Sequence, residues 1–200
     1  METIRENNDI LISGLAADGY LRVIGAETTQ LVEDARKTHN MSATATAALG
    51  RMLTGTVLMA KEMKNDTDKL TIQLKGKGPI GGMATVCRIK TKNGAAGALD
   101  KVFVKGYADH PYADLPIRES DGKLDVGGLV GKGFMNVMMD LGLKEPYSGS
   151  VPLRSGEIAE DFSYYYALSK QVPAAVSLGV LIGEQLDVMK AGGFMIQLLP

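Results

Sequence analysis

Six residues, Gly76-Lys77-Gly78-Pro79-Ile80-Gly81, match the G-x-G-x-x-G pattern of dinucleotide-binding loops. In such a loop the glycines lead directly into a helix whose N-terminus meets the pyrophosphate. Here the chain continues from Met83 to Ile89 in alternating apolar and polar residues, which is typical of a strand. We therefore interpret the loop as a hairpin turn. A small nucleotide-dependent enzyme that uses Gly76–Gly81 remains the alternative.

A second glycine-rich stretch, Gly128 to Gly133, matches a phosphate-binding P-loop only in part. Val126 stands where the P-loop needs its first glycine, and Gly133 replaces the hydroxyl residue that would bind Mg²⁺. This stretch predicts no phosphate site.

Three carboxylates, Glu157, Glu160 and Asp161, lie within about one helical turn, so a pair of them could do acid–base chemistry. Acids in the first turns of a helix are also expected because they complement the positive end of the helix dipole. We favour this second interpretation, with Ser155 as the cap of the helix, and we predict no catalytic residue and no enzymatic reaction.

The side chains with metal-binding or nucleophilic chemistry are few. Cys87 is the single cysteine, and with His39 and His110 alone it cannot complete a tetrahedral zinc site or a disulfide. Cys87 alternates in phase with Met83 and Ile89, so we expect a buried, inert thiol. No metal or other cofactor is predicted for this chain.

The composition is that of a globular protein. The chain has 200 residues, 45% of them hydrophobic and 22% charged, with 22 basic and 23 acidic residues. These values exclude whole-chain disorder, and the near-zero net charge argues against nucleic acid as a partner. The longest charge-free apolar stretch, Gln171 to Gly183, is too short to span a membrane, and the N-terminus lacks the pattern of a secretory signal. We expect one soluble, cytoplasmic domain over residues 1–200.

The pattern of elements predicts an α+β fold of mixed β-sheets packed in layers, with a few helices covering one side. Asp18-Gly19 predicts a hairpin, and Ser42 caps a predicted helix with one apolar stripe. The predicted strands are Leu11–Ala16, Tyr20–Ala26, Lys69–Lys75, Met83–Ile89, Leu99–Tyr107, Val176–Ile182 and Leu186–Leu199. The run Phe134–Met139 fits a strand or a helix, and we favour a strand. The predicted helices run from Thr28 or Thr29 to His39, from Ser42 to Met63 and from Ser155 to Ser169.

Eleven methionines are present and no tryptophan. Methionine fills irregular cores, and it also lines surfaces that adapt to different partners. Core filling is the simpler interpretation, and a surface role needs an independent reason to expect unspecific partners.

Five ordered motifs carry a resemblance that covers essentially the whole chain. They are Val104–Pro111 with Asp114-Leu115-Pro116, Asp140–Leu153, Ser155–Asp161, Tyr164–Tyr166 with Ser169, and Ala191–Phe194 with Ile196–Pro200. Taken in order, they resemble the N-terminal core domain of the bacterial 33 kDa chaperonin family, which are redox-regulated heat-shock holdases.

The resemblance implies an ATP-independent chaperone that binds unfolding proteins during oxidative and heat stress. In the family, four C-terminal cysteines bind one zinc ion. Their oxidation forms disulfides, releases the metal, unfolds a linker and leads to an active dimer. This sequence ends at Pro200 and its Cys87 matches none of those cysteines, so we interpret it as the core of a longer protein, without the linker and the redox switch.

Two sets of residues are predicted to make contacts. The apolar run Phe134, Met135, Met138 and Met139 cannot bury every side chain on one face of a strand, so these four are candidates for client contact. Phe194, Ile196 and Leu198 lie in the last apolar run and are candidates for self-association into a homodimer, because a missing covering segment would leave them exposed.

Overall fold

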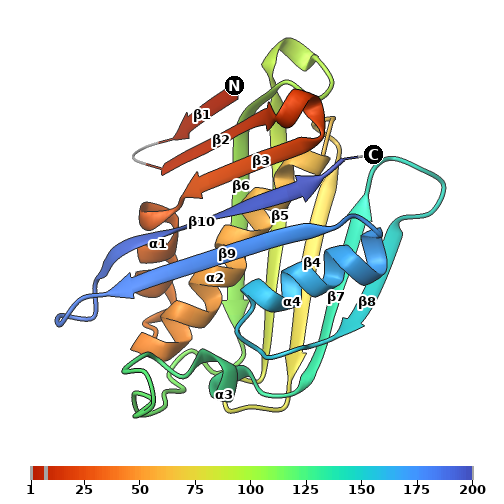
Figure 1. Cartoon of the computed structure of the whole chain (residues 1–200). Helices are drawn as coiled ribbons and strands as arrows, with labels where there is room; N and C mark the ends of the chain where they lie inside the picture. Colours follow the sequence, from red (N-terminus) through yellow and green to blue (C-terminus); the bar gives the residue numbers. More distant parts are fainter. Residues whose placement is uncertain (1, 7–8, 200) are drawn as a thin grey trace.

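The computed structural model describes residues 2–6 and 9–199, which form two five-stranded antiparallel sheets with helices between them (Figure 1). Sheet A has the order β1-β2-β3-β10-β9, and sheet B has the order β6-β5-β4-β7-β8. The strands of sheet A are β1 (Glu2–Glu6), β2 (Asp9–Ala16), β3 (Leu21–Glu27), β9 (Ala174–Ile182) and β10 (Val188–Leu198). The strands of sheet B are β4 (Lys69–Gly76), β5 (Gly82–Thr91), β6 (Leu99–Ala108), β7 (Gly133–Asp140) and β8 (Tyr147–Pro152).

Sheet A joins the two ends of the chain. The β2–β3 hairpin turns through Asp18 and Gly19, as predicted, and both residues have positive φ angles. The last strand, β10, pairs with β3 on one side and with β9 on the other. Sheet A is therefore complete only when residues near 195 meet residues near 25.

Sheet B is built from one continuous stretch of chain. The β4–β5 hairpin confirms that Gly76–Gly81 is a turn, and β7 then pairs with the free edge of β4. Two strands, β1 and β8, were not predicted. β8 has the sequence Tyr-Ser-Gly-Ser-Val-Pro, in which small polar residues and a proline hide the alternation.

Helix α2 (Ala43–Met59) lies between the two sheets (Figure 1). Its cap is the predicted one, since the hydroxyl of Ser42 accepts a hydrogen bond from the amide of Ala45 at 3.2 Å. The prediction of one apolar stripe is wrong, because nearly every residue of α2 is buried. A helix with a sheet on either side has no solvent-facing side, so its apolar surface extends all round.

The buried threonines of α2 find hydrogen-bond partners. Thr54 and Thr56 donate back to carbonyls one turn earlier, at 2.9 and 2.8 Å. Their hydroxyls also lie 2.7 Å from the hydroxyls of Thr28, next to sheet A, and of Thr85 in sheet B. These contacts connect the helix to both layers without leaving the hydroxyl groups unsatisfied.

Three further helices complete the layer: α1 (Thr29–His39), α3 (Val126–Val130) and α4 (Ala159–Tyr165). The predicted Ser155 cap is wrong, because α4 begins after Ile158. The buried carboxylate of Asp161 accepts from the amides of Arg154 at 2.5 Å, Ser155 at 3.2 Å and Ile158 at 3.0 Å. Asp161, in the first turn of α4, therefore holds the backbone that precedes the helix in place.

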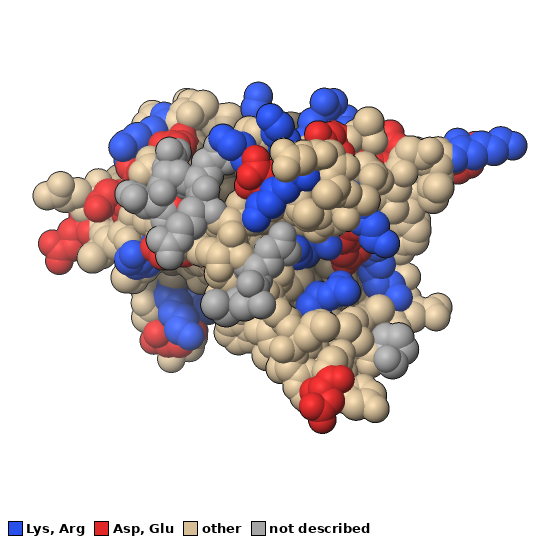
Figure 2. Space-filling view, turned by 90° about the horizontal axis from the view of Figure 1, so that it is seen from above, with Lys and Arg blue, Asp and Glu red and all other residues tan. Residues whose placement is uncertain are grey.

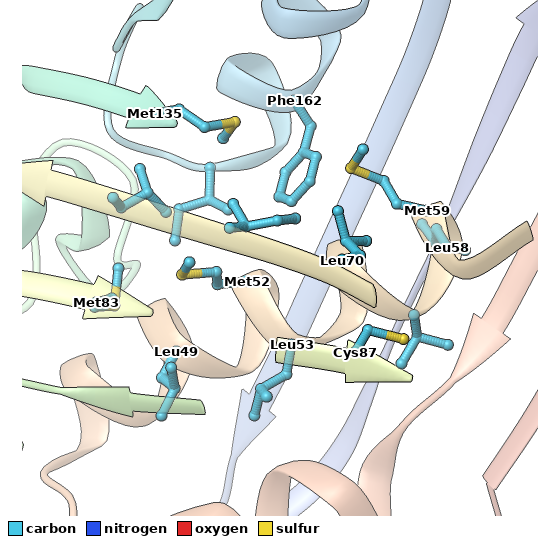
Figure 3. Close-up of a cluster of buried hydrophobic side chains, with 14 of the residues drawn as sticks. Leu49, Met52, Leu53, Leu58, Met59, Leu70, Met83, Cys87, Met135 and Phe162 are labelled. Atoms are coloured by element: carbon cyan, nitrogen blue, oxygen red, sulfur yellow. The ribbon is translucent and has the colours of Figure 1, made fainter. Parts of the chain in front are cut away.

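The core between the sheets is rich in sulfur (Figure 3). Phe162 of α4 and Leu70 of β4 pack there with side chains from α2. Eight of the eleven methionines are buried, which confirms core filling as their main role. They are Met41, Met52, Met59, Met63, Met83, Met135, Met139 and Met195.

The α+β class and the layered packing are confirmed. In finer detail, both sheets are antiparallel throughout, and the helices lie between the sheets and not on an outer side of them. Among residues 2–6 and 9–199, no helix covers the outer face of either sheet, away from α2, and the side chains there are open to solvent or half-buried.

Candidate functional site

The predicted client-contact run lies on β7 and is divided between its two faces. Phe134 and Met138 point outward and are 55% and 50% exposed. Met135 and Met139 point into the core and are at most 1% exposed, so their assignment as surface contacts is corrected. Strand alternation is the physical reason, because neighbouring side chains emerge on opposite faces.

The predicted self-association residues lie on the outer face of sheet A. Phe194 and Leu198 are 45% and 49% exposed, and Ile196 between them is half-buried. Met195, which points inward, is completely buried. All three predicted residues are therefore available at the surface.

Sequence reasoning missed the neighbours of these residues. Phe194 is paired with Gly25 and Gly25 with Ile12, while Ile196 is paired with Val23. Ile12 and Val23 are more than a third exposed, so the outer face of sheet A carries apolar side chains across three strands. The missing information was the register between β3 and β10, which joins segments about 170 residues apart and leaves no local sequence signal.

The Gly76–Gly81 turn uses its backbone donors within the protein. The amides of Gly78 and Ile80 donate to carbonyls of Val130 and Leu129 at 2.9 and 3.2 Å. The turn thus packs directly against α3, and a Cβ atom added to Gly76 or Gly78 would collide with carbonyl oxygens of that segment. A phosphate loop needs free amides pointing at its ligand. Here the glycines are needed because the backbone of the turn packs closely against the backbone of the α3 segment.

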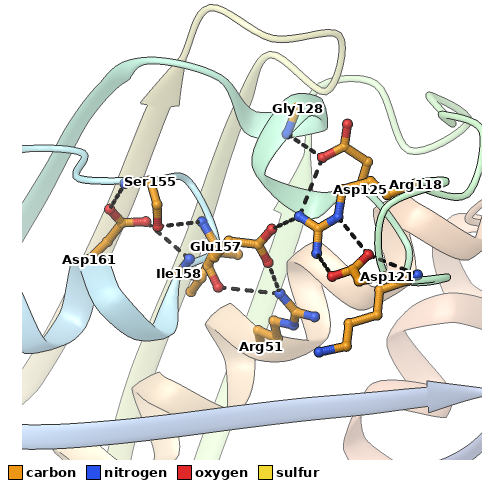
Figure 4. Close-up of polar contacts among 10 residues, drawn as sticks. Arg51, Arg118, Asp121, Asp125, Gly128, Ser155, Glu157, Ile158 and Asp161 are labelled. Carbon is orange, nitrogen blue, oxygen red and sulfur yellow. Dashed lines mark hydrogen bonds and ion pairs between the residues drawn. The ribbon is translucent and has the colours of Figure 1, made fainter.

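Two acidic residues around the start of α4, Glu157 and Asp161, are engaged in ion pairs and hydrogen bonds (Figure 4). Glu157 lies between two guanidinium groups: it binds Arg51 of α2 at 2.6 Å and also pairs with Arg118 of the loop before α3. Arg118 in turn binds Asp121 at 2.9 Å. The cluster joins three segments of chain, and we call it the Glu157 cluster.

The electrostatics of the Glu157 cluster favour charged groups. Burial acts to raise the pKa of Glu157, but the hydrogen bonds from Arg51 and Arg118 outweigh it, so the pKa lies below its usual value. The hydrogen bonds from Arg118 likewise lower the pKa of Asp121. A general acid at neutral pH needs a raised pKa, so the arrangement fits a structural clamp better than acid–base catalysis.

Cys87 lies in the core on β5 and is completely buried. Burial raises the pKa of its thiol to about 12. Within residues 2–6 and 9–199 no group of three or more His, Cys, Asp or Glu side chains is arranged to hold a metal ion. One buried thiol does not fit the four-cysteine zinc site that the resemblance implies, and no chemistry through zinc is derived for this chain.

No helix in the described part of the chain combines the length and the hydropathy needed to cross a bilayer.

Comparison with known proteins gives a consistent assignment. A family model described as Hsp33 protein matches residues 9–200. The chain is 47% identical to a 33 kDa chaperonin of Clostridium perfringens over 194 residues, which are 96% of this chain and 57% of that protein. It is 45% identical to the 33 kDa chaperonin of Acetivibrio thermocellus over 192 residues, covering 96% of this chain and 61% of the other.

The fold is also that of a solved relative. The crystal structure of the 33 kDa chaperonin from Thermotoga maritima matches with a TM-score of 0.81 and 38% identity, covering 93% of this chain and 59% of the other. The chain thus spans about three fifths of the length of the relatives it matches. Family match, sequence identity and fold agree, and the chain belongs to the Hsp33 family.

Proposed function

We propose that this chain is the client-binding core of an ATP-independent holdase, which binds unfolding proteins under heat and oxidative stress and keeps them from aggregating. The observation that carries the proposal is that apolar side chains outside the proposed dimer contact stay exposed in a folded chain, Ile12 and Val23 on the outer face of sheet A and Phe134 and Met138 on the outer face of sheet B. Exposed apolar groups in register across several strands mark an interaction surface. Membership of a family whose relatives are named chaperonins supports a client as the partner.

The outer face of sheet B offers further apolar contacts through Phe134 and Met138. Unfolded proteins differ in sequence, and an unbranched methionine adapts to different neighbours. Binding of this kind needs no reaction and no nucleotide. The alternative of a nucleotide-dependent enzyme has less support, because the amides of Gly78 and Ile80 are already bonded to the α3 segment.

The redox switch of the proposed holdase lies outside this chain. Its single cysteine is buried and has a raised pKa, which is the opposite of a reactive sensor thiol. We further propose a cytoplasmic protein that forms a homodimer through Phe194, Ile196 and Leu198, and that uses no cofactor in this part of the chain.

Light scattering of a heat-denatured enzyme tests the proposal. The chain at several-fold excess is expected to suppress aggregation equally with and without ATP. A matched pair of variants identifies the surface: Met138→Ser removes an exposed apolar group from sheet B, away from the proposed dimer contact, whereas Ser148→Ala changes the residue opposite it, which is exposed and small. Loss of suppression only in Met138→Ser supports the proposal. Absence of suppression by the unmodified chain contradicts it.

A further inference from the structure

The outer face of sheet B is basic, although the chain as a whole is almost neutral. Outward positions on three of its five strands, β4, β5 and β6, carry six of the 22 basic residues of the chain. Figure 2 shows Lys and Arg side chains along the upper margin of the molecule, with Asp and Glu side chains among them. The six are Lys69, Lys75, Arg88, Lys90, Lys101 and Lys105.

Like charges lie directly opposite each other on this face. Lys69 is the cross-strand partner of Arg88, and Lys90 is the partner of Lys101. Such pairs destabilise a sheet by roughly 0.2–1 kcal/mol each relative to neutral pairs. Asp140, the other cross-strand neighbour of Lys69, and Asp66, which interacts with Lys90, offset part of this repulsion.

Acidic residues lie near both ends of the face. Asp140 follows in register beside Lys69, Asp100 lies at a bulge of β6, and Asp66 interacts electrostatically with Lys90. Further along the strands, Asp109 lines the same surface hollow as Lys75, and its carboxylate accepts a hydrogen bond at 2.8 Å from the amide of Gly82, the cross-strand partner of Lys75. In the part of the chain that the structure describes, Lys69, Lys75, Arg88 and Lys105 join no ion pair.

Exposed apolar groups alternate with these cations. On β6 the outward side chains run Phe103, Lys105, Tyr107, and the two aromatic residues are 48% and 52% exposed. Successive outward side chains on a strand are about 6–7 Å apart. Across the sheet, Lys105 is followed in register by Val86, Thr71 and the exposed Met138. Cations and apolar groups are thus interleaved along the strand and across it.

We propose that the outer face of sheet B selects acidic segments of unfolded clients, taking an extended polypeptide in which carboxylates alternate with large apolar side chains. The inference rests on the proposed holdase function and names the class of client segment that this face prefers. Carboxylates would neutralise the unpaired cations, and the apolar groups would cover Phe103, Tyr107 and Met138. An extended peptide repeats its side chains with the same period of two as the strands beneath it.

Fluorescence anisotropy with two labelled peptides tests the charge preference. Both have the same apolar residues, and their charged positions are all Glu in one peptide and all Lys in the other. The Glu peptide is expected to bind at least fivefold more tightly at low salt, and the difference is expected to shrink at about 1 M salt, where the screening length falls to about 3 Å. Equal affinities for the two peptides would overturn the proposal.

Charge-reversal variants locate the site. Lys105→Glu and Arg88→Glu are each expected to weaken binding of the Glu peptide about fivefold. Lys144→Glu makes the same change of charge in the exposed β7–β8 turn, outside the face, and is expected to leave binding unchanged. Arg88→Glu also places an acid opposite Lys69, so its melting temperature should not fall, and a loss of binding there is not explained by unfolding.

Two outcomes separate this inference from the proposed function. If the unmodified chain suppresses aggregation while all three variants bind the Glu peptide alike, the basic face is not the selector and the holdase function stands. If the unmodified chain suppresses no aggregation, the holdase function itself fails. Tighter binding of a single-stranded RNA oligonucleotide than of the Glu peptide would assign the face to nucleic acid and overturn the proposal.

Discussion

Cys87 combines complete burial with a pKa near 12, and both properties affect its reactivity. Only the thiolate reacts with a disulfide reagent. At pH 8 the folded chain should therefore react slowly and the denatured chain quickly, as followed by absorbance of the released thiol. Fast reaction in the folded state would contradict the burial.

The same pKa shift has a consequence for stability. The folded chain keeps the thiol proton up to about pH 12, whereas the unfolded chain loses it near 9.0, the ordinary pKa of a cysteine thiol. The stabilising contribution is present below pH 9, and the free energy of unfolding falls as the pH rises from 9 towards 12. Cys87→Ala should cost about 1 kcal/mol in the free energy of unfolding at pH 7 and remove this contribution.

Peroxide should leave aggregation suppression unchanged in both the unmodified chain and Cys87→Ala. If peroxide changed suppression in the unmodified chain but not in Cys87→Ala, the redox switch would lie in the core.

Glu157 offers a second prediction at this scale. Glu157→Gln leaves Arg51, whose side chain is only 16% exposed, facing Arg118 without the intervening charge. We expect a loss of about 1–3 kcal/mol in the free energy of unfolding by urea at pH 7. Because the pKa of Glu157 is lowered in the folded chain, its contribution is present above pH 4.5 and is lost as the pH falls. The variant should therefore show a shallower acid dependence.

Glu160→Gln is the control for that variant. Glu160 is exposed, lies three residues further on, and joins no ion pair within the described residues. Its replacement should change stability by less than about 0.5 kcal/mol. Equal losses in the two variants would mean that the Glu157 cluster adds nothing.

At the scale of elements, the contact between α2 and α4 depends on a glycine. A Cβ atom on Gly55 would collide with the ring of Phe162, which is completely buried. Alanine favours a helix over glycine by about 1 kcal/mol, but overpacking a core costs about 1–3 kcal/mol. Gly55→Ala should lower the free energy of unfolding by about 1–2 kcal/mol. Gly179→Ala, where an added Cβ meets nothing within 4 Å, should be neutral or slightly stabilising.

Elements marked by local chemistry could be predicted from the sequence. The turn at Asp18-Gly19, the Ser42 cap and the alternation in β4, β5 and β9 depend on neighbouring residues, and all of them were confirmed. The burial of α2 on all sides and the start of α4 depend on what packs against them. Neighbouring residues in the sequence do not indicate that a sheet packs on each side of α2. They also do not indicate that the carboxylate of Asp161 accepts a hydrogen bond from the amide of Ile158.

The candidate sites follow the same division. Alternation predicts that some of Phe134, Met135, Met138 and Met139 are exposed, but the direction of the core decides which. The basic face of sheet B was missed because the near-neutral net charge of the whole chain does not show where on the surface the basic residues gather. Only the register of β4, β5 and β6 brings those cations together.

At the scale of the whole molecule, the apolar outer face of sheet A predicts self-association. Light scattering at micromolar concentration should give a mass that rises with concentration, because burying Phe194, Ile196 and Leu198 against a second copy removes apolar surface from water. Phe194→Ser should lower the association constant, and Phe134→Ser, on the other sheet, should not. A constant monomer mass in the unmodified chain would show that this face does not pair with itself.

The pairing of β3 with β10 also sets an order of events during synthesis. All strands of sheet B lie between residues 69 and 152, so this sheet can close while the rest of the chain is still being translated. Sheet A cannot close until β9 and β10 have left the ribosome. In that interval α2 has a sheet on one side only, and its other apolar side is uncovered. During its own synthesis, a protein proposed to bind incompletely folded chains is therefore itself incompletely folded. Its largest buried helix, α2, stays uncovered on one side until nearly the last residue of this chain is made.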